Sequence, residues 1–395
     1  MSWNTVIGQQ QQVRVLRSAL LGGRLAHAYL FTGPDGAGKE MVAFELAKAL
    51  SCTSSGTSPE GACGLCADCR EMEALLHPNV EYLFPVESAL LEGSDSPKKD
   101  NRKFTEAKER YDTLLEQKKA NPYFTPCMDR SMGILTEQVI QLQQKASFMP
   151  REGSRKVFII SQADRLHPSA ANKLLKLLEE PPPHILFILV SSRPESLLPT
   201  IRSRCQEIIF QRIPERELRS WMEEQRTDIA PDERESIVKA SRGSLRRAWE
   251  LMLNRMEPGF EPAEKAIRTK ALDYLRSILM AGHFHKAILS AEEQTKNLSR
   301  QELILFISSI LLFLQDAMHR SINPAFANLN NPDIADAVDR FARNFPNPDL
   351  MAISTLAEES IRSLERNAGS LLVMAAFTSQ LRPLIKKNQE NQGKN

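Results

Sequence analysis

The feature that most constrains this chain is a glycine-rich loop between an apolar strand and a helix-forming run. Residues 28–31 are apolar, residues 33–39 have the spacing Gly-x4-Gly-Lys, and residues 41–50 favour a helix. Such a loop holds phosphate oxygens with backbone N–H groups and the helix dipole, and its lysine adds a positive charge. A chance turn would not need the strand, loop and helix in this order. We therefore predict a nucleotide site that includes Gly33, Gly36, Gly38, Lys39 and Glu40.

Three residues depart from the pattern of a nucleotide hydrolase. The residue after the lysine is normally Ser or Thr, whose hydroxyl ligates Mg²⁺, but here it is Glu40. The apolar strand predicted at 157–160 should be followed by acidic residues for metal and water, and this chain has Ser161 and Gln162. Asp164 could substitute, although an acidic residue at a helix start is the alternative. We predict weak or absent hydrolysis and leave ATP and Mg²⁺ binding open.

Four of the six cysteines cluster after the first helix, in a loop rich in Ser, Gly and Pro. Thiolates at paired, short spacings can close a tetrahedral shell around Zn²⁺. Disulfides are one alternative, and free structural cysteines are another. Four protein ligands leave no open position for a substrate, so the zinc would be structural. The predicted ligands are Cys52, Cys63, Cys66 and Cys69.

Length and composition narrow the class of protein. A chain of 395 residues predicts two or three domains. The net charge of +2 gives no global support for nucleic-acid or membrane binding. Residues 1–4 carry no basic-then-apolar leader, and the apolar stretches 303–315 and 367–381 are shorter than the ~20 residues of a membrane span. We expect a cytoplasmic protein without membrane contact.

Sequence patterns divide the chain into a region of alternating strands and helices, an insertion within it, a linker and a tail. Residues 28–210 alternate between strand and helix patterns, which predicts a parallel sheet flanked by helices. Residues 87–131 are an insertion with mixed charges, and a helix at about 101–119 is expected to be a solvated surface rather than a basic nucleic-acid contact. Pro and Gly at 257–262 indicate a linker, and residues 386–395 predict a disordered tail.

Helical periodicity continues through the last third of the chain. The sequence predicts an all-helical bundle there. Its helices are expected to break or end at Pro324, Pro332, Pro346, Pro348 and Pro383. The expected helices span residues 266–280, 284–296, 300–319, 331–344 and 350–381.

A family resemblance rests on several motifs taken together. After the phosphate loop and the cysteine quartet come Ala-Asn-Lys-Leu-Leu-Lys-Leu-Leu-Glu-Glu-Pro-Pro at 171–182 and Leu-Pro-Thr-Ile-Arg-Ser-Arg-Cys at 198–205. In this order they resemble the AAA+ clamp loaders of bacterial DNA polymerase III, over residues 1 to about 255.

The resemblance implies a domain plan. It comprises an AAA+ α/β domain at 1–211 with a zinc module at 52–69, a small helical lid at 212–256, and a helical oligomerisation collar at 263–385.

Within that family, the departures at Glu40, Ser161 and Gln162 favour the delta prime type of subunit over the gamma and tau motor subunits. The resemblance then implies a stator that works with gamma/tau-type and delta subunits to load the sliding clamp on primed DNA. It also implies that Arg204 reaches a neighbour's ATP site as an arginine finger. The alternative for Arg204 is a local ion pair. The alternative functions are an active gamma/tau-type ATPase and a zinc-containing nucleic-acid binder that works alone.

The resemblance also marks candidate sensor residues. Gly-Ser-Leu-Arg at 243–246 is similar to the sensor-2 motif, which implies that Arg246 contacts nucleotide in its own subunit. The alternative is that Arg246 only holds the lid against the first domain. Ser191 or Ser192 falls in the region of the sensor-1 polar residue.

Overall fold

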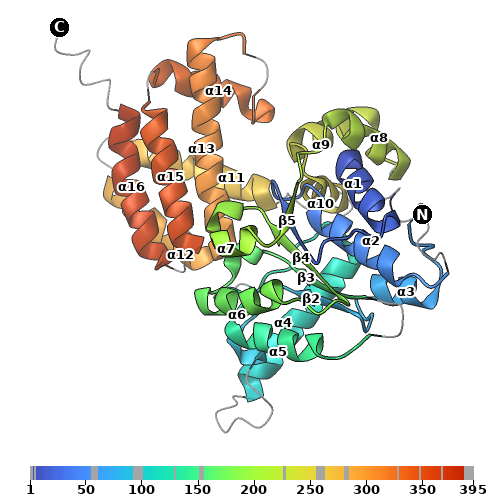
Figure 1. Ribbon diagram of the computed structural model, residues 1–395. Helices are drawn as coiled ribbons and strands as arrows, with labels where there is room; N and C mark the ends of the chain where they lie inside the picture. Colours follow the sequence, from blue (N-terminus) through green and yellow to red (C-terminus); the bar gives the residue numbers. More distant parts are fainter. Residues whose placement is uncertain are drawn as a thin grey trace. The chain divides into compact units, whose positions relative to one another are not determined.

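The computed structural model describes the chain apart from residues 1–2, 4–5, 55–60, 92–100, 129, 151–154, 226–227, 255–262, 280–283, 327–328, 347, 366–367 and 387–395. It divides into two compact units, Met1–Met256 and Glu257–Asn395, and Figure 1 shows the elements of each. The expected linker at 257–262 and nearly all of the expected tail lie outside the described residues.

A five-stranded parallel sheet forms the centre of the first unit, in the order β2-β3-β4-β1-β5. The three central strands β3, β4 and β1 are buried along their whole length, as a sheet covered by helices requires, whereas the edge strands β2 and β5 are partly exposed. Thr32 at the end of β1 pairs with Ser191 at the end of β4, so the glycine loop and the serine pair meet at one edge. The strands are β1 Ala28–Thr32, β2 Val80–Leu83, β3 Lys156–Ile160, β4 Ile185–Ser191 and β5 Gln206–Ile209.

Helices cover both faces of this sheet (Figure 1). On one face, Tyr29 and Phe31 pack with α1 Gln10–Leu21 and α2 Lys39–Ser51. On the other face, Leu30 packs with α5 and α6. The alternation of side chains along β1 places neighbouring residues in opposite layers. The predicted parallel sheet with flanking helices is confirmed. The remaining helices of the sheet region are α3 Ala67–Glu73, α5 Thr136–Ala146, α6 Pro168–Glu179 and α7 Pro199–Arg202, with 3₁₀ turns η2 Ser88–Leu90, η3 Ala163–Arg165 and η4 Pro194–Ser196.

The insertion contains α4 Asn101–Ala120, close to the expected helix. The prediction that this helix is only a solvated surface was wrong. Ala107 is fully buried, and Tyr111 stacks on Phe84 of the segment after β2 at a ring separation of 5.4 Å. Lys118, near the end of the helix, is also buried. Apolar side chains spaced three and four residues apart among the charges give α4 an inward face.

Three helices follow the sheet: α8 Glu215–Gln225, α9 Pro231–Ser241 and α10 Leu245–Asn254. They enclose a small core that includes Leu218, Met222 and Val238. Gly243, which joins α9 to α10, has a φ of +75°, and a Cβ there would lie 2.6 Å from the carbonyl oxygen of Ile213. Only glycine fits this turn, and it sets the close approach of α10 to the sheet region.

The second unit is all-helical, as expected. Two details of the prediction were wrong. The stretch expected as one helix at 350–381 forms two helices, and Gly369 precedes the second of them because glycine is a poor helix former. Pro383 lies inside the last turns of that helix and does not end it. The helices are α11 Ala263–Leu279, α12 Phe284–Asn297, α13 Arg300–Ile322, α14 Ala335–Asn344, α15 Leu350–Glu365 and α16 Ser370–Lys386, with a 3₁₀ turn η5 Pro332–Ile334.

Among the described residues, one helix is long and apolar enough to cross a membrane by length and composition. It is Glu302–Ile322 within α13, so the expectation that this stretch is too short was wrong. Half of it is buried, and Phe306, Ile310 and Leu314 are fully enclosed by the other helices of the unit. The core helix of a helical bundle has this pattern, and length alone is weak evidence for a membrane span.

Candidate nucleotide site and cysteine centre

The phosphate loop leaves β1 and enters α2 through glycines with positive φ. Gly33, Gly36 and Gly38 have φ values of +134°, +74° and +86°. A Cβ at Gly33 would collide with the carbonyl oxygen of Phe210. The glycine spacing read from the sequence is therefore required by the backbone path itself.

Lys39 begins α2 and is buried beneath this loop. Its Nζ donates hydrogen bonds to the carbonyl oxygens of Gly33 (2.6 Å) and Pro34 (2.7 Å) and to Oγ of Ser192 (3.1 Å). Desolvation lowers the pKa of Lys39 to about 8 from the ordinary 10.5, although nearby Asp35 acts in the opposite direction. The structure thus brings the loop lysine and the serine of the predicted sensor region together.

Glu40 follows Lys39 and is buried, and it has three side-chain partners. Its Oε2 accepts hydrogen bonds from Tyr82 (2.9 Å) and from Nζ of Lys118 (2.7 Å), and Ser161 donates to its Oε1. Desolvation and the Glu40 charge raise the pKa of Tyr82 well above its usual value. Two of the three residues that depart from the hydrolase pattern, Glu40 and Ser161, are therefore bonded to each other.

Lys118 comes from the insertion, and sequence reasoning did not place it in the site. Besides the ion pair with Glu40, its Nζ donates to the carbonyl oxygens of Pro122 (2.8 Å) and Phe124 (2.6 Å). It also lies 5.4 Å from the ring centre of Phe44. A buried lysine with three acceptors needs an internal carboxylate, and a buried glutamate needs a cation. The signal available in the sequence was the helical spacing of apolar residues in α4, which gives this helix an inward face.

Neither Gln162 nor Asp164 is available to bind a metal or orient a water. Gln162 is an amide, and the Asp164 carboxylate is already hydrogen-bonded. The Gln162 amide donates to the carbonyl oxygen of Pro126 (2.9 Å). Asp164 lies in η3, and its carboxylate accepts from Oγ of Ser191 (2.7 Å) and from Arg193 (3.3 Å). Asp164 therefore fixes the end of β4 from a nearly buried position.

The space left over the phosphate loop is small. The cavity has a volume of about 50 Å³ and is lined by the loop, by the ends of β3 and β4, and by the insertion. The insertion contributes Pro122, Tyr123 and Thr125 to its wall. Sites for cofactor-sized ligands are generally several hundred Å³.

The helices after the sheet close the loop from the other side. The backbone N–H of Leu245 donates to the carbonyl oxygen of Gly36 (2.9 Å), and Arg246 pairs with Asp35 at 2.8 Å. A Cβ at Gly36 would overlap Oγ of Ser244. Arg246 thus bonds the phosphate loop directly, which is the arrangement expected if it only holds the lid in place.

Arg204 lies just after α7, within the second family motif. Its guanidinium pairs with Glu179 at the end of α6 (2.8 Å) and donates to the carbonyl oxygen of Thr200 (3.0 Å). About a third of the side chain is exposed. In the chain by itself Arg204 forms the local ion pair that was its alternative role, and it stays accessible from solvent.

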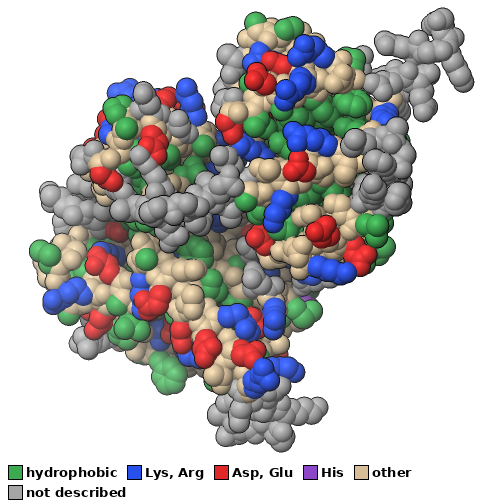
Figure 2. Space-filling view, turned by 180° about the vertical axis from the view of Figure 1, so that it is seen from behind, with side chains coloured by type: hydrophobic (Ala, Val, Ile, Leu, Met, Phe, Trp, Pro, Cys, Tyr) green, Lys and Arg blue, Asp and Glu red, His purple; other side chains and the backbone are tan. Residues whose placement is uncertain are grey.

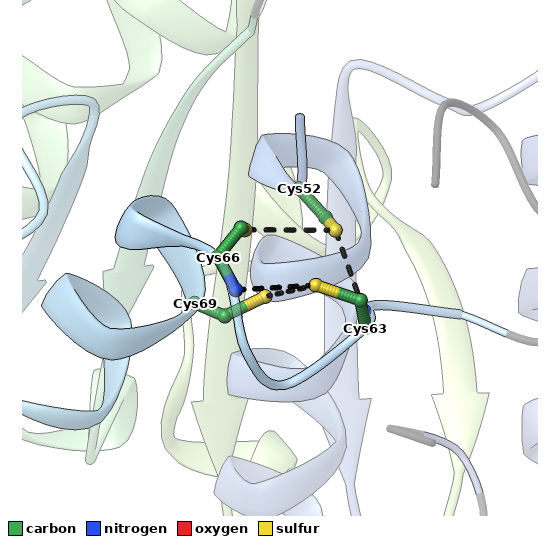
Figure 3. Close-up of side chains that lie close together, drawn as sticks. All are labelled: Cys52, Cys63, Cys66 and Cys69. Carbon is green, nitrogen blue, oxygen red and sulfur yellow. Dashed lines mark hydrogen bonds between the residues drawn. The ribbon is translucent and has the colours of Figure 1, made fainter. Parts of the chain in front are cut away.

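The four clustered cysteines converge at the start of α3 (Figure 3). The Sγ atoms of Cys52 and Cys66 lie 3.9 Å apart, as do those of Cys63 and Cys69. Four sulfurs at 2.3 Å from a tetrahedral Zn²⁺ would lie about 3.8 Å from one another. A disulfide needs an S–S distance near 2.05 Å, and all four cysteines are free. The set fits a tetrahedral metal.

Hydrogen bonds favour the thiolate form of Cys66, whereas burial raises the pKa of Cys69. Backbone N–H groups of Cys63 and Cys66 donate to sulfur at 3.3 Å. Desolvation raises the pKa of Cys66, but hydrogen bonds with Cys69 and Cys63 outweigh it and bring that pKa to about 6. Thiolates are the form that binds metal.

Charges on the surface of the chain are mixed. Figure 2 shows acidic and basic side chains interspersed on the face drawn, in keeping with the net charge of +2. A single-sign field of the kind that attracts nucleic acid over a wide surface is not visible on that face.

Comparison with known proteins places the chain among subunits of one bacterial enzyme. A family model described as "DNA polymerase III, delta subunit" matches residues 8–214, more than half of the chain. The delta' subunit of DNA polymerase III from Bacillus subtilis is 31% identical over 58% of this chain and 55% of its own length. The tau subunit from Escherichia coli is 29% identical over 62% and 32%, and the gamma/tau subunit from Mycobacterium tuberculosis is 29% identical over 56% and 30%. The match thus spans about a third to a half of these relatives.

Proposed function

Because the chain belongs to the DNA polymerase III delta-subunit family, we propose that it is a delta prime-like stator of a clamp loader. In this role it helps to load the sliding clamp on primed DNA, together with gamma/tau-type motor subunits and a delta subunit. It would act in the cytoplasm, without a membrane. Its first 211 residues would be an AAA+ domain, residues 212–256 its lid, and residues 263–385 the collar that joins it to the other subunits.

The observation that carries the proposal is the bonding of Glu40. Its carboxylate is taken by Lys118, Tyr82 and Ser161. Hydrolysis needs a metal between the loop and the phosphates and an oriented water, and neither Glu40 nor Asp164 is free to provide them. A subunit with this site contributes structure rather than its own turnover.

The chemical contribution would come from Arg204. A guanidinium can neutralise the charge that develops on a transferred γ-phosphoryl group, and such fingers are worth about 10³-fold or more in rate. Arg204 would leave Glu179 and reach a neighbouring subunit's ATP. An exposed ion pair of this kind is worth only about 1 kcal/mol or less, so the exchange would cost little.

The cysteine centre would bind one structural Zn²⁺ through Cys52, Cys63, Cys66 and Cys69. The ion would clip the loop after α2 onto α3 and give no open coordination position to a substrate. Nucleotide contacts from Gly33, Gly36, Gly38, Lys39 and Arg246 would be vestigial.

The second candidate is an active gamma/tau-type ATPase, which the similarity to tau and gamma/tau subunits favours. The two candidate functions differ in which subunit hydrolyses ATP, a neighbouring subunit or this chain itself. In the stator, loss of Arg204 affects a neighbour's turnover, whereas in the motor, loss of Lys39 abolishes the chain's own turnover.

The test is ATP turnover by a clamp loader assembled with this chain, its motor subunits, the clamp and primed DNA. Arg204→Ala should lower turnover at least tenfold. Arg202→Ala is the matched control, because Arg202 lies on the same turn and its ion pair within the described part of the chain is a long one, 3.8 Å from Glu207. Equal turnover in both variants would contradict the finger.

A further inference from the structure

We infer that the insertion closes this chain's own phosphate loop: Lys118 provides a covalently tethered cation where a metal-bound nucleotide would need Mg²⁺, and residues 121–125 fasten the lid over it. The inference goes beyond the clamp-loader role, since it concerns the isolated chain and does not depend on any partner. It also assigns a purpose to α4, which the family motifs leave unexplained.

The charge of Glu40 is balanced by Lys118 of the insertion. The Glu40 and Lys118 side chains are 8% and 3% exposed and lie 2.7 Å apart. All three ammonium hydrogens of Lys118 have acceptors, on Glu40 and on the backbone of Pro122 and Phe124. The negative charge that replaces the usual hydroxyl is therefore already neutralised from within the chain.

A magnesium ion does not fit this arrangement. Mg²⁺ requires six oxygen ligands at about 2.1 Å and keeps several waters when it binds with phosphates. The Glu40 carboxylate points its oxygens at an ammonium, a phenol and a hydroxyl, and a second cation beside Lys118 would be repelled. Mg·ATP could enter only if this ion pair were broken.

The insertion also occupies space over the phosphate loop. The chain from Asn121 to Phe124 turns back after α4, with Tyr123 N–H donating to the Asn121 side chain (2.9 Å). Pro122, Tyr123 and Thr125 then line the cavity over the loop, which holds only about 50 Å³. The insertion thus occupies part of the volume that a nucleotide would need.

The insertion also contacts the lid helices through Tyr123. The Tyr123 ring lies 5.9 Å from Trp221 of α8 and 5.8 Å from Trp249 of α10, at angles of 87° and 58°. Edge-on aromatic contacts at these distances are attractive. With Arg246 bonded to Asp35, the lid is held against the loop from two sides without any nucleotide. We define residues 118–125 as the strap.

The experiment is equilibrium binding of a fluorescent ATP analogue with Mg²⁺ to the full isolated chain. Glu40→Thr combined with Lys118→Met removes both charges and restores a hydroxyl after the loop lysine. The expected result is no saturable binding by the wild type up to about 1 mM, and binding at least tenfold tighter in the double variant. Lys119→Met is the control, because among the described residues Lys119 forms an ion pair only with exposed Glu116 on the same helix, and it should match the wild type.

A second variant keeps the test decisive if the double variant folds poorly. Tyr123→Ala leaves the Glu40–Lys118 pair intact but frees the lid, and it should raise hydrogen exchange in α8 and α10 while still binding no Mg·ATP. Tight binding by the wild type, or a folded double variant that binds no better than Lys119→Met, would overturn the inference. The stator proposal and this inference both rest on the bonding of Glu40. Neither result would bear on Arg204, so the arginine finger is tested separately.

Discussion

The cysteine centre and the phosphate loop lie in the same unit, and residue spacing predicts both of them. They differ in whether the side chains fit the predicted ligand. At the cysteine centre the four sulfurs stand at the separations a tetrahedral metal needs. At the phosphate loop the glycines keep their backbone path, yet the next side chain is bonded to Lys118 instead of facing an open metal site. Spacing therefore specifies a backbone shape, while chemistry depends on which distant side chains arrive there.

The largest expected effect is loss of the metal. Cys69→Ser should abolish zinc binding and lower the free energy of unfolding by about 5 kcal/mol or more, because metal binding is coupled to folding of its loop. Metal content and urea unfolding would measure both.

Cys205→Ser is the control for the cysteine centre. Cys205 lies outside the cluster, and this variant should keep one zinc per chain. If Cys69→Ser also kept its zinc and its stability, the contrast between the two regions would disappear.

Next in size is the ion pair under the phosphate loop. Lys118→Met leaves the Glu40 carboxylate buried without its cation, and such a change costs about 3–5 kcal/mol. Chemical unfolding of Lys118→Met beside Lys119→Met gives the comparison. An equal and small effect in both variants would mean that the pair does not hold the insertion in place.

A third prediction uses pH. Burial lowers the pKa of Lys39 to about 8 from 10.5. Between these values the unfolded chain binds more protons than the folded one, so stability rises with pH. The wild type should gain about 2–3 kcal/mol relative to Lys39→Met across this window. A flat difference from pH 7 to 11 would show that Lys39 is not desolvated.

The smallest effect concerns the lid. Tyr123→Ala should cost about 1–2 kcal/mol by removing its contacts with Trp221 and Trp249. Tryptophan emission should also shift, since two of the three tryptophans lose a neighbour. Met132→Ala removes an exposed side chain and should change neither quantity. An unchanged tryptophan emission spectrum for Tyr123→Ala would mean that the strap does not contact the lid.

Sequence alone predicted what depends on local pattern. The buried strand at 157–160, the glycine loop and the cysteine spacing each depend on residues that are close together in the sequence. The helical character of the C-terminal unit was equally clear, although length did not reveal that 350–381 holds two helices.

The pairing of Glu40 with Lys118 could not be predicted in this way, because the two residues are 78 positions apart. In the sequence, Glu40 was only a departure from the hydrolase pattern, and Lys118 was one of the charges on a helix that was expected to be solvated. The inward face of α4 was a missed signal, since Ala107, Tyr111 and Leu114 recur at helical spacing among the charges. The position of Arg204 against Glu179 likewise depends on how α6 and the end of α7 meet in the fold.

The most direct test of the account is ATP turnover by the purified chain alone, measured with Mg²⁺ and compared with Lys39→Ala. A phosphate loop closed by Lys118 predicts no turnover above background in either protein. Robust turnover by the wild type that Lys39→Ala abolishes would contradict it, and would make this chain a motor rather than a stator.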